Sequence, residues 1–465
     1  MTDRLHQRFP ALRSRVGVSR WDITPSLDVA ARNWGAAKHL FATSVHRPLT
    51  GTALALSAID EKAPALLLIS LDLGWWLRHA DAEALRERVL RELELPEANV
   101  IIHLTHTHAG PVLDSDAPPE SNPQAGRDYL EQLANSCVQG GRAALANQES
   151  ATTLFRTGHC GLATERDLID PDKPNRYITG FNPGAPADDT LLTALSLNDE
   201  GKALATLINY ACHPTTLAWD NTSISPDYPG AMRELVENET TQSPCLFLQG
   251  ASGELAPAEQ YSGDPELADR HGRELGHAAL STLGPMFTGH THLRYDGVVE
   301  SGAPLAQWQA CSQPVNSTLR AMVIPLELPL KSDLPTIAEI EHALEKEEDG
   351  FQKARLMRAR RVRQSVGDGP NFDAKLWLWR IGDAAICAMP FEAYSVFQTE
   401  LRAAFPNMPI FVLNISNGHI GYIPPAPLYD HDLYTVWQTP LARGAHEQIY
   451  AATVTGIREL FAQES

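Results

Sequence analysis

Continuous apolar runs recur along the chain, and charged or Gly- and Pro-containing segments separate them. Each run ends in Gly, Pro or polar residues, which is typical of buried strands. Helical patterns lie between several of the runs, so strands and helices share one chain. We expect buried strands within residues 65–76, 99–104, 203–213, 244–250, 384–390 and 409–415.

Two segments carry a helical period instead. In residues 81–95 the apolar positions fall on one helical face and Arg and Glu cover the other, which predicts a helix packed on a sheet. Residues 337–366 are charged throughout, with an acidic half before a basic half. That pattern favours a solvated helical hairpin, broken near Gly350, over an interaction surface. The apolar positions of the first segment are Ala82, Leu85, Val89, Leu90 and Leu93.

These elements predict an α/β fold. At 465 residues the chain is long enough for one large domain or for two. Stretches with Pro and Gly near 256–267 and 301–316 are compatible with loops or with a subdomain boundary, but no low-complexity linker or repeat separates two units. We therefore expect a single domain over residues 1–465, with a subdomain boundary, if there is one, near 301–316.

The charge balance excludes some partners. Lys and Arg total 38 against 57 Asp and Glu, a net charge of −19, which disfavours nucleic acids and anionic membrane surfaces. The first 20 residues lack the apolar core of a secretory signal, and no run of about 18 apolar residues follows. We expect a cytoplasmic protein without stable membrane insertion. The six cysteines have no CxxC spacing, which favours buried, reduced thiols.

The segment THTHAGP, residues 105–111, directly follows one predicted strand. In a strand, residues i and i+2 point to the same face, so His106 and His108 are expected to project together where Gly110 turns the chain. An HxH pair alone is weak evidence for a metal, because histidines with ordinary structural roles are commoner than ligands.

Other predicted strands also end in polar groups. His213 stands at the end of the run 203–213, Glu392 follows Pro390, and His419 and Tyr422 lie in a Gly-rich loop after 409–415. Imidazole nitrogens and a carboxylate oxygen are ligands that zinc accepts, and a catalytic zinc keeps a position open for water. An alternative is that Glu392 only caps the helix that begins after it.

Five segments together resemble a known family. THTHAGP, CHPTTL, FLQGASGELAP, MPFEAY and NGHIGYI stand in the order and context of the signature segments of neutral (alkaline, non-lysosomal) ceramidases, and RVGVSRWDITP and HRPLTGTALAL near the N-terminus fit as well. The resemblance covers nearly the whole chain. It implies a large mixed-sheet α/β catalytic domain, without the C-terminal immunoglobulin-like domain that full-length ceramidases append.

The resemblance also implies a Zn²⁺ site and its surroundings. The implied ligands are His106, His213, Glu392 and Tyr422. Zinc brings the pKa of bound water toward 7, and three further side chains would face the substrate or stabilise an oxyanion. These implied catalytic residues are His108, Tyr434 and Arg176, with Arg166 as a competitor of Arg176.

The chain departs from the family at several points. Ala256 stands where ceramide-cleaving members carry a serine, Glu254 is an additional acid, and His419 replaces a frequent aromatic residue. Ceramidases of this kind are also usually exported. These departures favour a substrate more polar than ceramide.

The sequence thus predicts a zinc-dependent hydrolase that cleaves an amide or related bond of a small molecule by zinc-activated water. Two alternatives stay open. One is a zinc-assisted lyase or glycoside-cleaving enzyme in which Tyr434, His108 or Glu254 acts as acid or base. The other is a protein that keeps the zinc pocket for binding without turnover. The acyl group, the oligomeric state and the physiological metal are not determined by the sequence.

Overall fold

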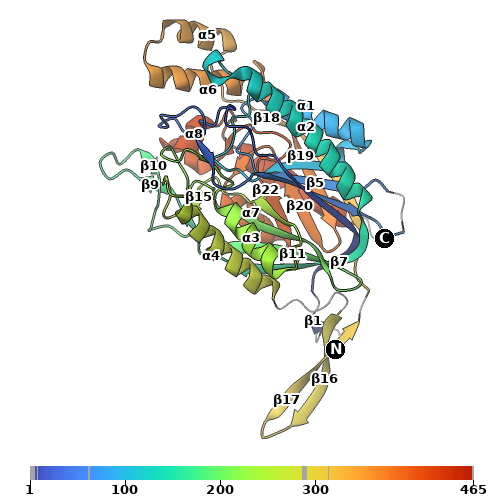
Figure 1. Ribbon diagram of the computed structural model, residues 1–465. Coiled ribbons are helices and arrows are strands. Elements are labelled where there is room, and N and C mark those ends of the chain that lie inside the picture. Colours follow the sequence, from blue (N-terminus) through green and yellow to red (C-terminus); the bar gives the residue numbers. More distant parts are fainter. Residues whose placement is uncertain (1–5, 8, 61–62, 285–290, 313, 463–465) are drawn as a thin grey trace.

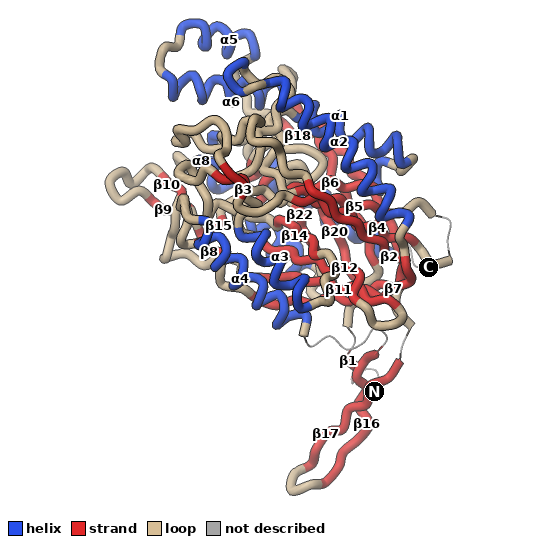
Figure 2. The backbone as a smooth tube through the Cα atoms, viewed as in Figure 1, coloured by secondary structure: helices blue, strands red, loops and turns tan. Residues whose placement is uncertain are grey.

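The computed structural model describes residues 6–7, 9–60, 63–284, 291–312 and 314–462. Two β-sheets face each other in the middle of the molecule, and helices cover their outer faces (Figures 1 and 2). The predicted α/β fold class is confirmed.

The larger sheet has eight strands in the order β14-β12-β11-β7-β2-β4-β5-β6. The pairs β12/β14 and β5/β6 are parallel and the other neighbours are antiparallel, so the sheet is mixed. Its parallel pairs lie at the two edges. The strands are β2 (Ala11–Asp22), β4 (Thr50–Ser57), β5 (Leu66–Leu71), β6 (Val100–Leu104), β7 (Glu149–His159), β11 (Thr190–Asn198), β12 (Ala203–Tyr210) and β14 (Cys245–Gln249).

The smaller sheet has four strands in the order β18-β19-β20-β22. The runs predicted as buried strands form β5, β6, β12, β14, β20 and β22, and each of these strands is almost wholly buried, because each is covered on both faces. The strands of the smaller sheet are β18 (Leu319–Pro329), β19 (Asn371–Ile381), β20 (Ala384–Ala388) and β22 (Ile410–Leu413).

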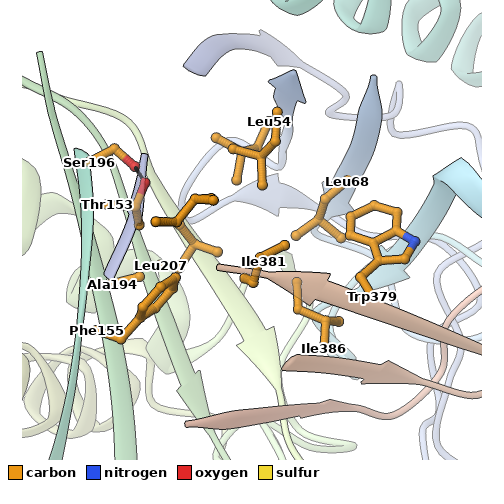
Figure 3. Close-up of a pocket in the computed structure, with 12 residues that line it drawn as sticks. Leu54, Leu68, Thr153, Phe155, Ala194, Ser196, Leu207, Trp379, Ile381 and Ile386 are labelled. Atoms are coloured by element: carbon orange, nitrogen blue, oxygen red, sulfur yellow. Dashed lines mark hydrogen bonds between the residues drawn. The ribbon is translucent and has the colours of Figure 1, made fainter. Parts of the chain in front are cut away.

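Apolar side chains fill the space between the two sheets. Leu54 and Leu68 of the larger sheet meet Trp379 and Ile386 of the smaller one around a narrow gap (Figure 3). The two hydroxyls that border the gap, on Thr153 and Ser196, are hydrogen-bonded to each other at 2.8 Å. The gap is therefore part of the packed core. Its described lining has no unpaired polar group that could hydrogen-bond a ligand.

Helices complete the layers. α1 (His79–Leu93) and α2 (Pro123–Ala146) cover one half of the outer face of the larger sheet, and α3 (Tyr228–Glu239) and α4 (Pro265–Leu283) cover the other half. α7 (Ser395–Ala404) and α9 (Ala445–Ala462) cover the smaller sheet. The predicted apolar face of α1 packs on the sheet, which confirms that amphipathic pattern.

Two hairpins extend from the layers. α5 (Ile337–Lys346) and α6 (Gly350–Val366) form the helical hairpin predicted from the charge pattern, while β16 (Thr291–Glu300) and β17 (Pro304–Ser312) form an antiparallel arm that projects from the body (Figure 1). The range 301–316, which the sequence suggested as loops or a boundary, includes the tip of this arm and β17; residue 313 lies outside the described residues.

Short elements connect the layers around the strand ends. Among the described helices, none combines the length and apolar character needed to cross a membrane. All six cysteines are free thiols; five are buried, and Cys311 in the arm is only partly buried. The short elements are β1 (His6–Gln7), β3 (Ser44–Val45), β8 (Ala163–Glu165), β9 (Asp167–Ile169), β10 (Tyr177–Thr179), β13 (Ser223–Ile224), β15 (Leu255–Pro257), β21 (Glu392–Ala393), β23 (Tyr422–Ile423), α8 (Tyr434–Gln438) and 3₁₀ turns at Glu97–Asn99, Pro119–Ser121 and Ala426–Asp430.

Candidate metal centre

The THTH segment lies beyond the end of its strand. β6 ends at Leu104, and His106 has φ +75°, so the predicted i, i+2 strand geometry is wrong. A left-handed backbone is uncommon for a non-glycine residue and is frequent at functional sites. The backbone N–H groups of Thr105 and His106 bind the carbonyls of Leu71 and Leu73, which fixes this bend after β5 and β6. The rings of His106 and His108 still meet, with centroids 4.8 Å apart.

A buried ion pair supports the same bend. Arg233 of α3 donates two hydrogen bonds of 2.7 and 2.6 Å to Asp72, directly after β5, and Thr105 donates to the same carboxylate at 3.2 Å. Asp72 also accepts bonds from the backbone and hydroxyl of Thr50. Asp72 therefore links the THTH segment, through Thr105, to α3 and to the start of β4.

His106 and His213 are held in the same way. Each ring donates a hydrogen bond from Nδ1 to a backbone carbonyl, from His106 to Gly74 at 3.0 Å and from His213 to Ser252 at 2.6 Å. A neutral imidazole that donates from Nδ1 keeps a lone pair on Nε2. Burial lowers the pKa of His213 to about 3, and the Arg166 charge acts in the same direction, so this ring is neutral near pH 7.

One carboxylate oxygen of Glu392 faces the free Nε2 atoms of both His106 and His213. Its Oε2 lies 3.3 Å from Nε2 of His106 and 3.1 Å from Nε2 of His213, while its Oε1 lies 2.9 Å from Nε2 of His419.

Glu392 does not cap the following helix. It lies in β21, and α7 begins three residues later at Ser395. The backbone N–H and the hydroxyl of Ser395 instead donate to Glu254. The capping alternative for Glu392 is therefore wrong, and that role belongs to the additional acid of the FLQGASGELAP segment.

The donor set fits a zinc ion. Two imidazole nitrogens with free lone pairs and one carboxylate oxygen converge with separations of 3.1 and 3.3 Å to the oxygen. Four donors placed about 2.0–2.1 Å from zinc in a tetrahedron lie about 3.3–3.4 Å apart. The Nδ1–H bonds to carbonyls are the supporting contacts that metal-bound histidines usually make.

Tyr422 lies beside this cluster. β23 pairs with β21 so that Tyr422 is the register partner of Glu392, and its ring stacks on His213 with centroids 6.4 Å apart. Burial raises the pKa of the phenol well above its ordinary value, and the nearby Glu392 charge raises it further. A divalent cation would be needed to favour the phenolate.

The arginine beside Tyr422 is Arg166. This buried side chain donates to the Tyr422 hydroxyl at 3.2 Å and to the carbonyl of Gly253 at 2.6 Å. The side chain of Arg176 is 47% exposed and pairs with Asp170, so the structure does not bring it to the cluster. The sequence preferred Arg176 to Arg166, but it is Arg166, between β8 and β9, that contacts Tyr422.

Tyr434 and His108 each contact a different member of the cluster. Tyr434 begins α8, and its ring lies 5.7 Å from that of Tyr422. The two ring nitrogens of His108 are buried, and no described residue hydrogen-bonds to either of them. One ligand atom from each of His106, His108 and His213 lies within 4.8 Å of the others. Burial lowers the pKa of His108 well below its ordinary value, as does nearby His106.

Comparisons with known proteins were made by family model, by sequence and by structure. No protein-family model matches the chain, and no curated sequence matches it. A solved structure of a ceramidase complexed with C2 superposes with a TM-score of 0.68 at 14% identity, covering 97% of this chain and 76% of that one. The neutral ceramidase from Pseudomonas aeruginosa gives 0.67 at 16% identity, with 97% and 75% covered.

The fold is that of the neutral ceramidases. The fold class expected from the sequence resemblance is thereby confirmed, at an identity that speaks for the fold alone. The roles of the individual site residues stay predictions.

Within this ceramidase fold, the departures noted in the sequence have definite places. Ala256 is fully buried in β15, where its carbonyl accepts a bond from Thr164. His419 holds the second oxygen of Glu392. The sequence placed His419 in a loop after a buried strand but assigned it no role, and it carried no signal for the aromatic residues around His108, which come from loops far apart in the chain.

Proposed function

We propose that this protein is a zinc-dependent hydrolase of the neutral ceramidase type that cleaves an amide or related bond. The observation that carries the proposal is the convergence of two buried imidazole lone pairs and one carboxylate oxygen at 3.1 and 3.3 Å. His106, His213 and Glu392 would hold the ion, with Tyr422 as the fourth protein ligand. A bound zinc supplies Lewis acidity and lowers the pKa of water toward 7.

The chain's own residues supply the rest of the chemistry. His108, neutral because burial lowers its pKa, is available to accept the proton that water loses on adding to the carbonyl carbon. The same proton can pass to the leaving nitrogen as the C–N bond breaks. Arg166 and Tyr434 lie beside Tyr422 and would stabilise the negative charge on the carbonyl oxygen.

The preferred substrate is more polar than ceramide. Ala256 offers no hydroxyl at the position where ceramide-cleaving members carry serine, and its carbonyl is already used by Thr164. Hydrolysis of long-chain ceramide by the purified protein is expected to be poor or absent. Strong zinc-dependent ceramide turnover would contradict this preference.

The first test is metal content. The purified protein should carry about one zinc per chain by elemental analysis, because one such set of donors converges among the described residues. Removal of zinc with a chelator should abolish hydrolysis of a short N-acyl amide, and re-addition should restore it. A protein that neither contains zinc nor takes it up on addition would refute the proposal.

A further inference from the structure

Four aromatic rings from separate segments gather around His108. The centroids of Trp34 and Trp75 lie 5.0 and 4.8 Å from the His108 ring. Trp34 in turn contacts Trp219 at 5.9 Å and Tyr261 at 5.6 Å. All four rings are only partly buried, so each keeps surface for a ligand. We call these four residues the aromatic wall.

The wall contains polar atoms that no described residue satisfies. The indole N–H of Trp34 and both ring nitrogens of His108 are buried without a hydrogen-bond partner in the described chain. A purely apolar ligand would leave these groups unpaired, which costs binding free energy. A ligand that offers hydroxyls beside an apolar face would satisfy them.

A recess next to the wall has the same mixed character. Trp34 and His108 line it together with Asn33, His39 and Asn221, and it has room for a group about the size of one water molecule. The Asn221 amide is bonded to the backbone of Ser223, and Asn33 donates to the carbonyl of Gly110, so these side chains are fixed beside the indole. The polar groups left for a ligand are those of Trp34 and His108.

The charge beside the wall disfavours a cationic ligand. Arg166 is buried nearby, where its charge opposes the rise that burial causes in the pKa of Tyr261. An aromatic wall alone would also suit a quaternary ammonium group, but a fixed guanidinium next to it repels one.

We propose that the aromatic wall binds a hydroxylated sugar ring and that the recess takes one of its hydroxyls, so that the substrate is an N-acylated amino sugar or a glycoside that carries one. The inference rests on the proposed function, because the metal cluster beside His108 is taken as the reacting end. Hydrolysis of such a substrate adds water across the amide, breaks the C–N bond and yields a carboxylic acid and the amino sugar.

The test is a pair of probes that differ in hydroxyls. By titration calorimetry on the purified protein, the methyl glycoside of N-acetylglucosamine should bind at least about ten times more tightly than N-acetylcyclohexylamine, which has the ring and the amide without hydroxyls. Equal or tighter binding of the cyclohexyl probe, tighter binding of tetramethylammonium, or no binding of the sugar up to about 10 mM would each overturn the inference.

A variant pair locates the binding. Trp34→Phe should weaken sugar binding about tenfold by removing the N–H and part of the stacking surface, while Trp308→Phe in the exposed arm should leave it unchanged. Equal affinities for both variants would overturn the assignment to the wall. The probe comparison on the unsubstituted protein needs neither variant to fold.

The experiments distinguish sugar binding from zinc-dependent hydrolysis. Sugar binding without zinc uptake or hydrolysis would refute the proposed function and leave the sugar site standing. Zinc-dependent hydrolysis of aliphatic amides with no sugar binding would refute this inference alone.

Discussion

The two histidines of the THTH segment differ in how their rings are fixed. His106 donates from Nδ1 to a carbonyl and points Nε2 at Glu392, as metal ligands do, whereas neither nitrogen of His108 has a described partner. His106→Ala should therefore remove zinc and activity together. His108→Ala should keep the zinc and lower turnover by roughly ten- to a thousandfold. Zinc retained in the first variant and lost in the second, by elemental analysis, would invert the assignment.

The histidine at position 419 acts on the metal through Glu392. Its Nε2 holds Oε1 at 2.9 Å and leaves Oε2 to the other two histidines. His419→Phe should weaken zinc affinity by about 10- to 100-fold, the usual effect of losing a group that orients a ligand. The measurement is competition with a chromophoric chelator.

The matched control for that substitution is His342→Phe, at an exposed position of α5 far along the chain from the site. It should bind zinc like the unsubstituted protein. Equal zinc affinity of the His419 and His342 variants would show that Glu392 is oriented without His419.

For single residues, the sequence predicted members of the site only where these residues follow buried strands. His106, His213 and Glu392 do so, and the structure brings them together. Arg166 could not be told from Arg176, because both lie among short strands whose path depends on tertiary contacts. The role of His419 could not be predicted either, since it depends on which Glu392 oxygen faces the loop.

Among the elements, the N-terminus of α7 has an unusual cap. Glu254 accepts from the backbone N–H of Ser395, and burial raises its pKa from the ordinary 4.5 to about 8, with Glu165 adding to the rise. Between these values the native state holds a proton that the unfolded chain has released. The free energy of unfolding should therefore fall as pH rises through this window, by up to about 1.4 kcal/mol per pH unit from this group.

Glu254→Gln should remove that contribution. Urea unfolding at pH 5, 6.5 and 8 should show the variant becoming more stable relative to the unsubstituted protein as pH rises. Glu348→Gln, at an exposed position, serves as the control and should leave the pH profile unchanged. Parallel profiles for the Glu254 variant and the unsubstituted protein would contradict the buried, protonated cap.

Elements with a strong local pattern were predictable, and those set by tertiary contacts were not. The continuous apolar runs became the buried strands, and the charged segment became the α5–α6 hairpin. The arm of β16 and β17 has no such pattern, because exposed residues such as Val298 and Trp308 follow neither a helical nor a buried-strand rule. The left-handed backbone at His106 likewise arises from bonds to β5 and its loop.

In the whole molecule, the candidate metal centre joins the two sheets. His106 and His213 follow strands β6 and β12 of the larger sheet, while Glu392 follows β20 of the smaller one. Buried apolar side chains pack between the two sheets. The polar cluster forms where residues that follow strands of one sheet contact a residue that follows a strand of the other. A ligand held by residues of both sheets stabilises their association.

Zinc should therefore raise the stability of the entire fold. A ligand that binds only the native state at 100 times its dissociation constant adds about 2.7 kcal/mol to the free energy of unfolding. The thermal midpoint should rise when zinc is added to chelator-treated protein, and magnesium at the same concentration should have little effect, because nitrogen ligands disfavour it. His106→Ala should show no response to zinc, since it lacks one of the two imidazoles that face Glu392. An unsubstituted protein with the same midpoint in zinc and in chelator would mean that the cluster does not hold the ion across the two sheets.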